Sequence, residues 1–246
     1  MPLMVIQIGP NKYGDLAFTA TSLFDGERDI KMNLQSDDNA LPILHLVNAS
    51  KSFVDKTILC NATFIFEHGK KYLITGPSGT GKTALLNVLA GLDHLDDGRI
   101  ETETSTVIQY LFQDVLLFSD LSARENLLIK QMTDPTYMGN LKNEIISNAL
   151  TAVGIDHTTA EKKVSLLSGG EQRRVQLAQL LMFGPDLVLL DEPTANLDYK
   201  NKQELIELIN TLFPNATIII SSHDIEYIPN DYIRLELQNG DFNNER

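Results

Sequence analysis

A glycine-rich segment between a predicted strand and a predicted helix is the part of the chain best suited to bind phosphate. Residues 76–83 read GPSGTGKT and fit the pattern G-x-x-x-x-G-K-[ST], whose glycines let successive backbone N–H groups point at phosphate oxygens. In such a loop the lysine, here Lys82, reaches the β- and γ-phosphates, and the hydroxyl of the next residue, Thr83, ligates Mg²⁺. The expected phosphate-binding residues are Gly76, Pro77, Ser78, Gly79, Thr80, Gly81, Lys82, Thr83 and Ala84. The alternative, a surface turn with an ordinary lysine, is disfavoured by the strand before the loop and the helix after it.

Two carboxylates follow a second apolar strand, predicted at residues 187–190. They are Asp191 and Glu192, and where a strand ends the chain turns, so that both can face one ligand. We expect Asp191 to hold Mg²⁺ through water and Glu192 to act as the general base for an attacking water. An ordinary acidic turn is the alternative, and the phosphate-binding loop upstream makes it less favourable.

A histidine and a glycine pair complete the set of candidate groups. His223 follows the apolar strand predicted at residues 216–221, where an imidazole can sense a γ-phosphate and orient a water. Ser168 is a good N-cap for the helix predicted at 172–183, and Gly169 and Gly170 allow a close approach of the backbone to a phosphate. A simple capped helix start is the alternative for this segment. The remaining histidines are expected at the surface or in turns; they are His45, His68, His94 and His157.

The elements that position these groups alternate between strand and helix. Besides the strands already named, we expect a strand-rich region from Ile43 and a strand at 70–75. Helices are expected at 84–90, across most of 121–165 with breaks at Pro135, Gly139 and Gly154, and near 201–212. Such alternation predicts a largely parallel sheet covered on both faces. The first residues are harder to assign: 5–8 and 16–19 read as short strands around a turn at 9–11, and 33–40 reads as a linker.

Composition excludes several classes of protein. The chain has 246 residues and a net charge of −13, and so acidic a surface repels nucleic-acid phosphates. No run of residues approaches the ~20 apolar positions needed to cross a bilayer. Direct membrane insertion and nucleic-acid binding are therefore not expected. The one cysteine, Cys60, is expected to be a small apolar core residue rather than a reactive thiol.

The candidate groups, taken in chain order, resemble the motifs of the ATP-binding-cassette (ABC) ATPases, the motor subunits of ABC transporters. Those motifs are Walker A at 76–83, the Q-loop at Gln113, the signature at 167–171, Walker B at 187–192, the D-loop at 195–198 and the switch histidine at His223. The resemblance covers about residues 43–242. It implies an α/β fold of the ABC type, a P-loop NTPase with a mainly parallel sheet and a helical signature subdomain at about 114–172. Because only residues 99–112 separate Gly98 from the Q-loop, we expect a reduced antiparallel β subdomain. The ATPase domain is expected at 41–246, and 1–40 is an extension that could be a hairpin, a docking arm or a disordered tail.

The resemblance also implies a mechanism, with ATP and Mg²⁺ as cofactors. Two ABC subunits, the same or different, would dimerise head to tail, so that Ser168, Gly169 and Gly170 contact the γ-phosphate bound to the partner. Phe53 would stack on adenine, with a core aromatic as the alternative, and Asp198 would also lie at the nucleotide. The implied catalytic residues are Glu192, His223, Gln113 and Lys82, and the implied metal ligands are Thr83, Gln113 and Asp191.

The predicted function is therefore that of the ATP-hydrolysing subunit of an ABC transporter. It would be cytoplasmic, held at the inner face of the membrane by a separate transmembrane permease. The residues around Gln113 resemble the lipoprotein-release and macrolide-export branch. One alternative is a soluble ABC ATPase of DNA repair or translation, which the lack of a coiled-coil insertion and the acidic charge disfavour. Another is a regulatory cassette, which the presence of Glu192 and His223 disfavours.

Overall fold

The computed structural model describes residues 5–10, 16–21, 42–53, 56–103, 105–132, 143–238 and 241–244. The strands in these ranges are β1 (Val5–Pro10), β2 (Leu16–Thr21), β3 (Pro42–Phe53), β4 (Lys56–Glu67), β5 (Lys71–Thr75), β6 (Asp97–Thr102), β7 (Ile108–Leu111), β8 (Leu187–Asp191), β9 (Thr217–Ser221), β10 (Ile233–Gln238) and β11 (Asp241–Asn244). The helices are α1 (Lys82–Leu89), α2 (Ala123–Met132), α3 (Asn143–Ala152), α4 (His157–Ala160), α5 (Gly169–Leu181) and α6 (Tyr199–Leu212), with short 3₁₀ turns η1 (Val164–Leu166) and η2 (Ile225–Tyr227). The predicted linker at 33–40 and the predicted breaks at 135 and 139 lie outside the described residues.

A six-stranded sheet forms the centre of the fold, in the order β11-β10-β5-β9-β8-β7. Strands β10, β5, β9, β8 and β7 run parallel to their neighbours, and β11 pairs antiparallel with β10. Every residue of β8 and β9 is buried, as expected when helices or a second sheet cover both faces. The predicted parallel sheet is confirmed, and its order makes β5, β9 and β8 consecutive neighbours.

A smaller antiparallel sheet, in the order β4-β3-β6, packs beside the central one. The short stretch after Gly98 leaves room for one strand on this side, β6, so the predicted reduction of the antiparallel subdomain is confirmed. At the start of β6, Gly98 has φ +81°, and a Cβ built there would lie 2.3 Å from the carbonyl oxygen of Asn48. Only glycine allows the backbones of β3 and β6 to approach so closely.

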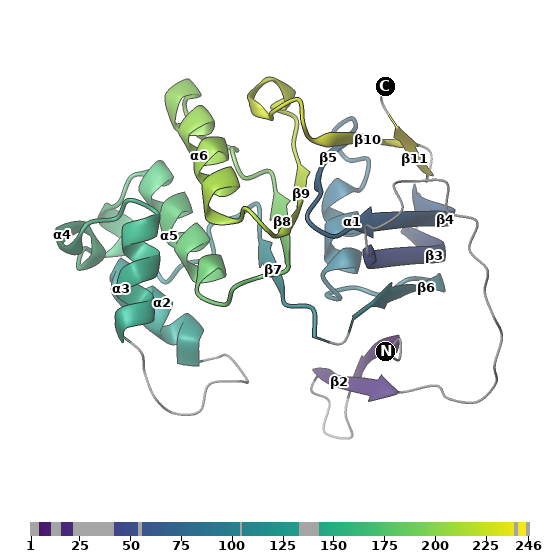
Figure 1. Ribbon diagram of the computed structural model, residues 1–246, viewed down its shortest axis with the longest axis horizontal. Coiled ribbons are helices and arrows are strands. Elements are labelled where there is room, and N and C mark those ends of the chain that lie inside the picture. Colours follow the sequence, from purple (N-terminus) through teal and green to yellow (C-terminus); the bar gives the residue numbers. More distant parts are fainter. Residues whose placement is uncertain are drawn as a thin grey trace.

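Two hydrophobic clusters cover the two faces of the central sheet. Figure 1 shows α1 between the central sheet and the antiparallel strands, with α2 to α5 gathered at the other end of the molecule. Leu85 and Leu89 of α1 pack with Leu44 and Phe66 of the antiparallel sheet and with strands of the central sheet. The opposite face of the sheet packs against residues of α2, α3, α5 and α6. Helix α1, which follows the glycine-rich loop, is thereby held against β8 and β9.

Helix α5 begins at Gly169, three residues before the predicted start at 172. Ser168 is its N-cap, as predicted: its hydroxyl accepts from the N–H of Glu171, whose carboxylate accepts from the N–H of Ser168 at 2.8 Å. This reciprocal pair is a capping box. The hydrogen bonds that Glu171 accepts hold its pKa below the usual range.

Three sequence expectations are wrong. Cys60 is exposed rather than buried: the register places an extra residue of β4 between the pairs Leu59↔Lys51 and Ala62↔Ala49, and Asn61 has φ +51°. This bulge interrupts the alternation of inward and outward side chains. His45 lies in β3 rather than at a turn, half-buried 3.1 Å from Glu101. The strands predicted at 5–8 and 16–19 pair as an antiparallel hairpin, but residues 9 and 10 belong to β1 rather than to a turn.

Candidate nucleotide-binding site

The candidate residues meet where three parallel strands end side by side. The loops that follow β5, β8 and β9 open into one cavity of about 540 Å³. It is lined by Ser78, Gly79, Gly81, Lys82, Thr83, Ala84, Asn87, Gln113, Asp191, Glu192, Ala195 and His223. Groups from the predicted Walker A, Q-loop, Walker B and switch segments are therefore brought together, as expected for the carboxyl edge of a parallel sheet.

The glycine-rich loop wraps from β5 into α1. Gly76, Gly79 and Gly81 have φ values of +142°, +77° and +101°, conformations that favour glycine. The N–H of Thr80 donates to the carbonyl oxygen of Pro77 at 3.1 Å, which closes the turn. Gly81 is the N-cap of α1 and carries no side chain, so the first N–H groups of the helix stay open to an anion.

Lys82 lies within this loop and is 6% exposed. Its ammonium donates to the carbonyl oxygen of Gly76 at 2.9 Å and contacts Nε2 of His223 at 3.0 Å. Burial lowers the pKa of Lys82, while the negative charges of Glu192 and Asp191 counteract that shift. A cation held this way, with little water around it, favours a polyanionic ligand.

Asp191 is the candidate metal-binding carboxylate and is 1% exposed. Its Oδ1 accepts from the hydroxyl of Ser221 at 2.5 Å, which fixes the carboxylate at the end of β8. Its Oδ2 is buried and has no hydrogen-bond partner within the described part of the chain. A buried carboxylate oxygen without a partner, in a cavity that Thr83 also lines, suits a hydrated Mg²⁺ ion.

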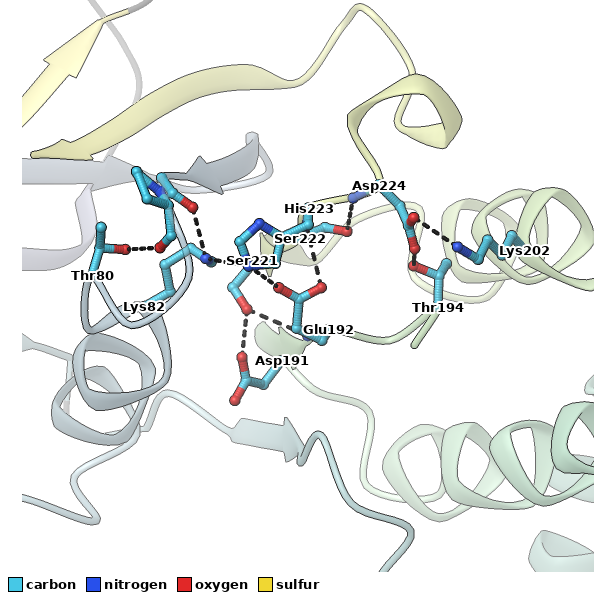
Figure 2. Close-up of polar contacts among 12 residues, drawn as sticks. Thr80, Lys82, Asp191, Glu192, Thr194, Lys202, Ser221, Ser222, His223 and Asp224 are labelled. Atoms are coloured by element: carbon cyan, nitrogen blue, oxygen red, sulfur yellow. Dashed lines mark hydrogen bonds and ion pairs between the residues drawn. The ribbon is translucent and has the colours of Figure 1, made fainter. Parts of the chain in front are cut away.

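Glu192 and His223 lie next to each other in the wall of the cavity (Figure 2). Glu192 has φ +44°, uncommon for a residue with a side chain, and its N–H donates to the carbonyl oxygen of Ser221 at 3.0 Å. Its carboxylate accepts from the backbone N–H of His223 at 3.2 Å and lies 3.4 Å from Nε2 of that ring. Nε2 of His223 therefore lies between the Lys82 ammonium, which can only donate, and the Glu192 carboxylate, which accepts.

Two residues in or near the cavity belong to none of the motifs recognised in the sequence. Asn87 follows Thr83 by four residues, and this helical spacing places both on the same face of α1. Arg173 is 3% exposed in α5; it donates to the carbonyl oxygens of Gln113 and, at 2.9 Å, Phe112. Arg173 therefore holds the backbone at Gln113, although no local pattern distinguishes it from a surface arginine.

Several predicted residues do not line this cavity. Ser168, Gly169 and Gly170 lie at the start of α5, and Asp198 caps α6 by accepting from the N–H of Asn201 at 3.0 Å. Phe53 ends β3 and is 50% exposed, so the alternative of a core aromatic is wrong. One face of its ring carries the ammonium of Lys51, 5.0 Å from the ring centroid.

A strand, a glycine-rich loop and a helix that bears lysine and threonine, next to a strand ending in two carboxylates, define the P-loop class of nucleotide-binding proteins. The family described as "ABC transporter" matches residues 59–195, more than half of the chain. The chain therefore belongs to the ABC transporter family, and the predicted fold class is confirmed.

Relatives and solved structures agree with this assignment. The spermidine/putrescine import ATP-binding protein PotA of Fusobacterium nucleatum subsp. nucleatum is 34% identical over 197 residues, 74% of this chain and 50% of that protein. The chain thus spans half the length of that relative. The phosphonates import ATP-binding protein PhnC of the same organism is 32% identical over 207 residues, 75% of this chain and 83% of that protein. A dimeric, post-hydrolysis structure of the ATP-binding cassette MJ0796 bound to ADP and Pi matches with a TM-score of 0.70 at 25% identity, covering 82% of this chain and 97% of that one.

Proposed function

We propose that this chain binds and hydrolyses Mg-ATP as the motor subunit of an ABC transporter. The observation that carries the proposal is the convergence of Lys82, Asp191, Glu192 and His223 on one cavity at the ends of adjacent parallel strands. A lysine for phosphate, a carboxylate for metal and a second carboxylate for water are the groups that phosphoryl transfer to water requires. Their presence supports hydrolysis over the regulatory alternative.

The geometry supports a distinct role for each group. Lys82 and the open N–H groups of the loop bind the phosphates, and Thr83, Asp191 and Gln113 hold the metal. Bound Mg²⁺ supplies positive charge that offsets the charge of the β- and γ-phosphates. The carboxylate of Glu192 accepts the proton of the attacking water. His223 stays beside Glu192 and Lys82, where its ring can contact the γ-phosphate and keep the water in line.

The signature residues support a site shared between two subunits. Ser168 and Gly169 are exposed and line no part of this chain's own cavity. Backbone N–H groups at the start of α5 suit a phosphate, so we propose that they contact the nucleotide of a second ABC subunit packed head to tail. Asp198 and Phe53 are proposed to contact nucleotide as well, Phe53 through the open face of its ring.

We propose a transmembrane permease as the other partner. No helix in the described ranges is both long and apolar enough to span a membrane, and Leu116 and Phe118, just after Gln113, are each 60% exposed. Attachment to the permease would place the chain at the inner face of the membrane.

The lipoprotein-release and macrolide-export branch remains a proposal from the residues around Gln113, whereas the relatives named above are importers. We also keep the proposed division into an extension at 1–40 and an ATPase domain at 41–246, with a helical part at about 114–172.

Phosphate release by the purified chain tests the proposal. We expect Mg-dependent hydrolysis by the unmodified protein and loss of turnover in Glu192→Gln, because an amide cannot accept the proton of water. That variant should bind ATP as tightly as the unmodified protein in calorimetry. Near-normal hydrolysis by Glu192→Gln would reject Glu192 as the base. A chain that neither binds nor hydrolyses ATP would reject the function.

A further inference from the structure

The loop that carries His223 is tied to two other segments by a single carboxylate. Asp224 accepts from the hydroxyl of Thr194 at 2.8 Å and from the ammonium of Lys202 at 2.7 Å (Figure 2). Thr194 follows Walker B and is fully buried, and Lys202 lies in the first turn and a half of α6. We call Thr194, Lys202 and Asp224 the switch-loop clamp. It joins the loop after β9, the loop after β8 and the start of α6.

The clamp continues the contacts that fix the backbone on either side of His223. The N–H of Asp224 donates to the hydroxyl of Ser222 at 3.0 Å, and the N–H of His223 donates to Glu192. The ring of His223 is only half-buried, with 48% of its side chain exposed, so core packing does not determine its position. The position of this ring therefore depends on its contacts with Lys82 and Glu192 and on where the backbone is held.

Charge makes the clamp stronger than a set of neutral hydrogen bonds. Burial raises the pKa of Asp224, but the hydrogen bonds from Lys202 and Thr194 outweigh that effect, and the net pKa lies below the usual range. The hydrogen bond to Asp224 raises the pKa of Lys202. Both groups are charged at neutral pH, and charge-assisted hydrogen bonds are about twice as strong as neutral ones. The ring centroid of Tyr227, in η2, also lies 5.3 Å from the Lys202 ammonium.

We propose that Asp224 is a positioning residue that sets the place of His223 relative to Glu192 and Lys82 through this clamp. It contacts no atom that reacts. The inference rests on the proposed function, since it assumes that His223 contributes to hydrolysis. Loss of the clamp should lower turnover and leave ATP affinity unchanged, because the glycine-rich loop and Lys82 hold the phosphates independently of Asp224.

The test compares variants of the clamp by turnover and by ATP affinity. Asp224→Ala should lower kcat by about tenfold or more, since small displacements of catalytic groups reduce rates strongly, and should change the Kd for ATP by less than about twofold. Asp224→Asn should recover part of the rate, because its amide can accept from Lys202 and donate to Thr194. Lys202→Met should lower kcat in the same direction, whereas Lys200→Met, two residues away and with its side chain 85% exposed, should not.

A double-mutant cycle with His223→Ala separates positioning from a general structural effect. If Asp224 acts through His223, adding Asp224→Ala to His223→Ala causes no further loss of kcat. Additive losses, a rise in the Kd for ATP of tenfold, or no effect of Asp224→Ala in an active His223-dependent enzyme would each overturn the inference. Normal hydrolysis by His223→Ala alone would instead reject the role proposed for His223. If Asp224→Ala fails to fold, the same cycle with Lys202→Met decides.

Discussion

Replacing Asp191 with asparagine should affect the free protein and the Mg-ATP complex in opposite directions. Asp191 is a carboxylate at 1% exposure with one hydrogen bond, from Ser221, and one oxygen without a partner in the described residues. An asparagine can still accept from Ser221 through its carbonyl oxygen. It removes the negative charge and leaves a buried amide group in place of Oδ2.

The expected change in the free energy of unfolding follows from comparing the buried carboxylate of Asp191 with the buried amide that replaces it. A buried ion costs several kcal/mol even after the protein relaxes, and the negative charge of Asp191 also attracts Lys82, where it counteracts the effect of burial on the pKa of the ammonium. An unpaired buried amide costs about 1–3 kcal/mol. We therefore expect the free Asp191→Asn protein to be about 1–2 kcal/mol more stable than the unmodified chain, which raises the melting temperature by about 2–8 °C for a domain of this size.

With Mg-ATP bound, the unmodified protein should become more stable than Asp191→Asn. A ligand at 100 times its Kd stabilises the unmodified protein by about 2.7 kcal/mol, and Asp191→Asn should lose most of the part of this gain that depends on Mg²⁺. Thermal unfolding followed by circular dichroism, without ligand, with ATP and EDTA, and with Mg-ATP, measures all three states. The reasoning is refuted if the free variant is less stable than the unmodified chain and still gains the full Mg²⁺-dependent stabilisation.

Two further changes test the phosphate-binding loop and the close contact between β3 and β6. Lys82→Ala should weaken ATP binding by about 10- to 100-fold, the value of one or two charged hydrogen bonds, while the exposed Lys200→Ala should not; equal affinities in calorimetry would contradict the role of Lys82. Gly98→Ala should destabilise the fold by about 2–5 kcal/mol, from its positive φ and a contact with the backbone of Asn48. Gly184 also has a positive φ, but a Cβ built there would have no atom within 4 Å. Gly184→Ala should therefore lower the free energy of unfolding by only about 1 kcal/mol. Equal losses for the two variants in urea unfolding would refute this account.

Much of the site could be predicted because its signals are local. The glycine-rich loop, the carboxylates after β8 and the histidine after β9 each follow an apolar strand, and parallel strands bring their carboxyl ends together. Side-chain pairs between distant segments have no such signal. Arg173 and the carbonyl oxygen of Phe112 are 61 residues apart, and Thr194 and Asp224 are 30 apart, and nothing periodic in the sequence relates them.

The errors in the prediction have a similar origin. Alternation along β4 would bury Cys60, but the extra residue in that strand shifts the pattern, and a bulge of this kind leaves little trace in composition. His45 was expected at the surface because no motif surrounds it, yet its pairing with Glu101 comes from the register between β3 and β6. The helix cap at Ser168 could be predicted from sequence because a capping residue before a helix is again a local feature.

Light scattering on Glu192→Gln, with and without Mg-ATP, tests most directly whether two of these chains build the ATP sites together. Our account predicts a monomer without nucleotide and a doubling of mass with Mg-ATP, and it predicts that adding Ser168→Arg, which places a bulky cation at the exposed start of α5, abolishes the doubling. A protein that binds Mg-ATP but remains a monomer would contradict a site shared between two copies of this chain. A dimer that still forms with Ser168→Arg would contradict the signature contact.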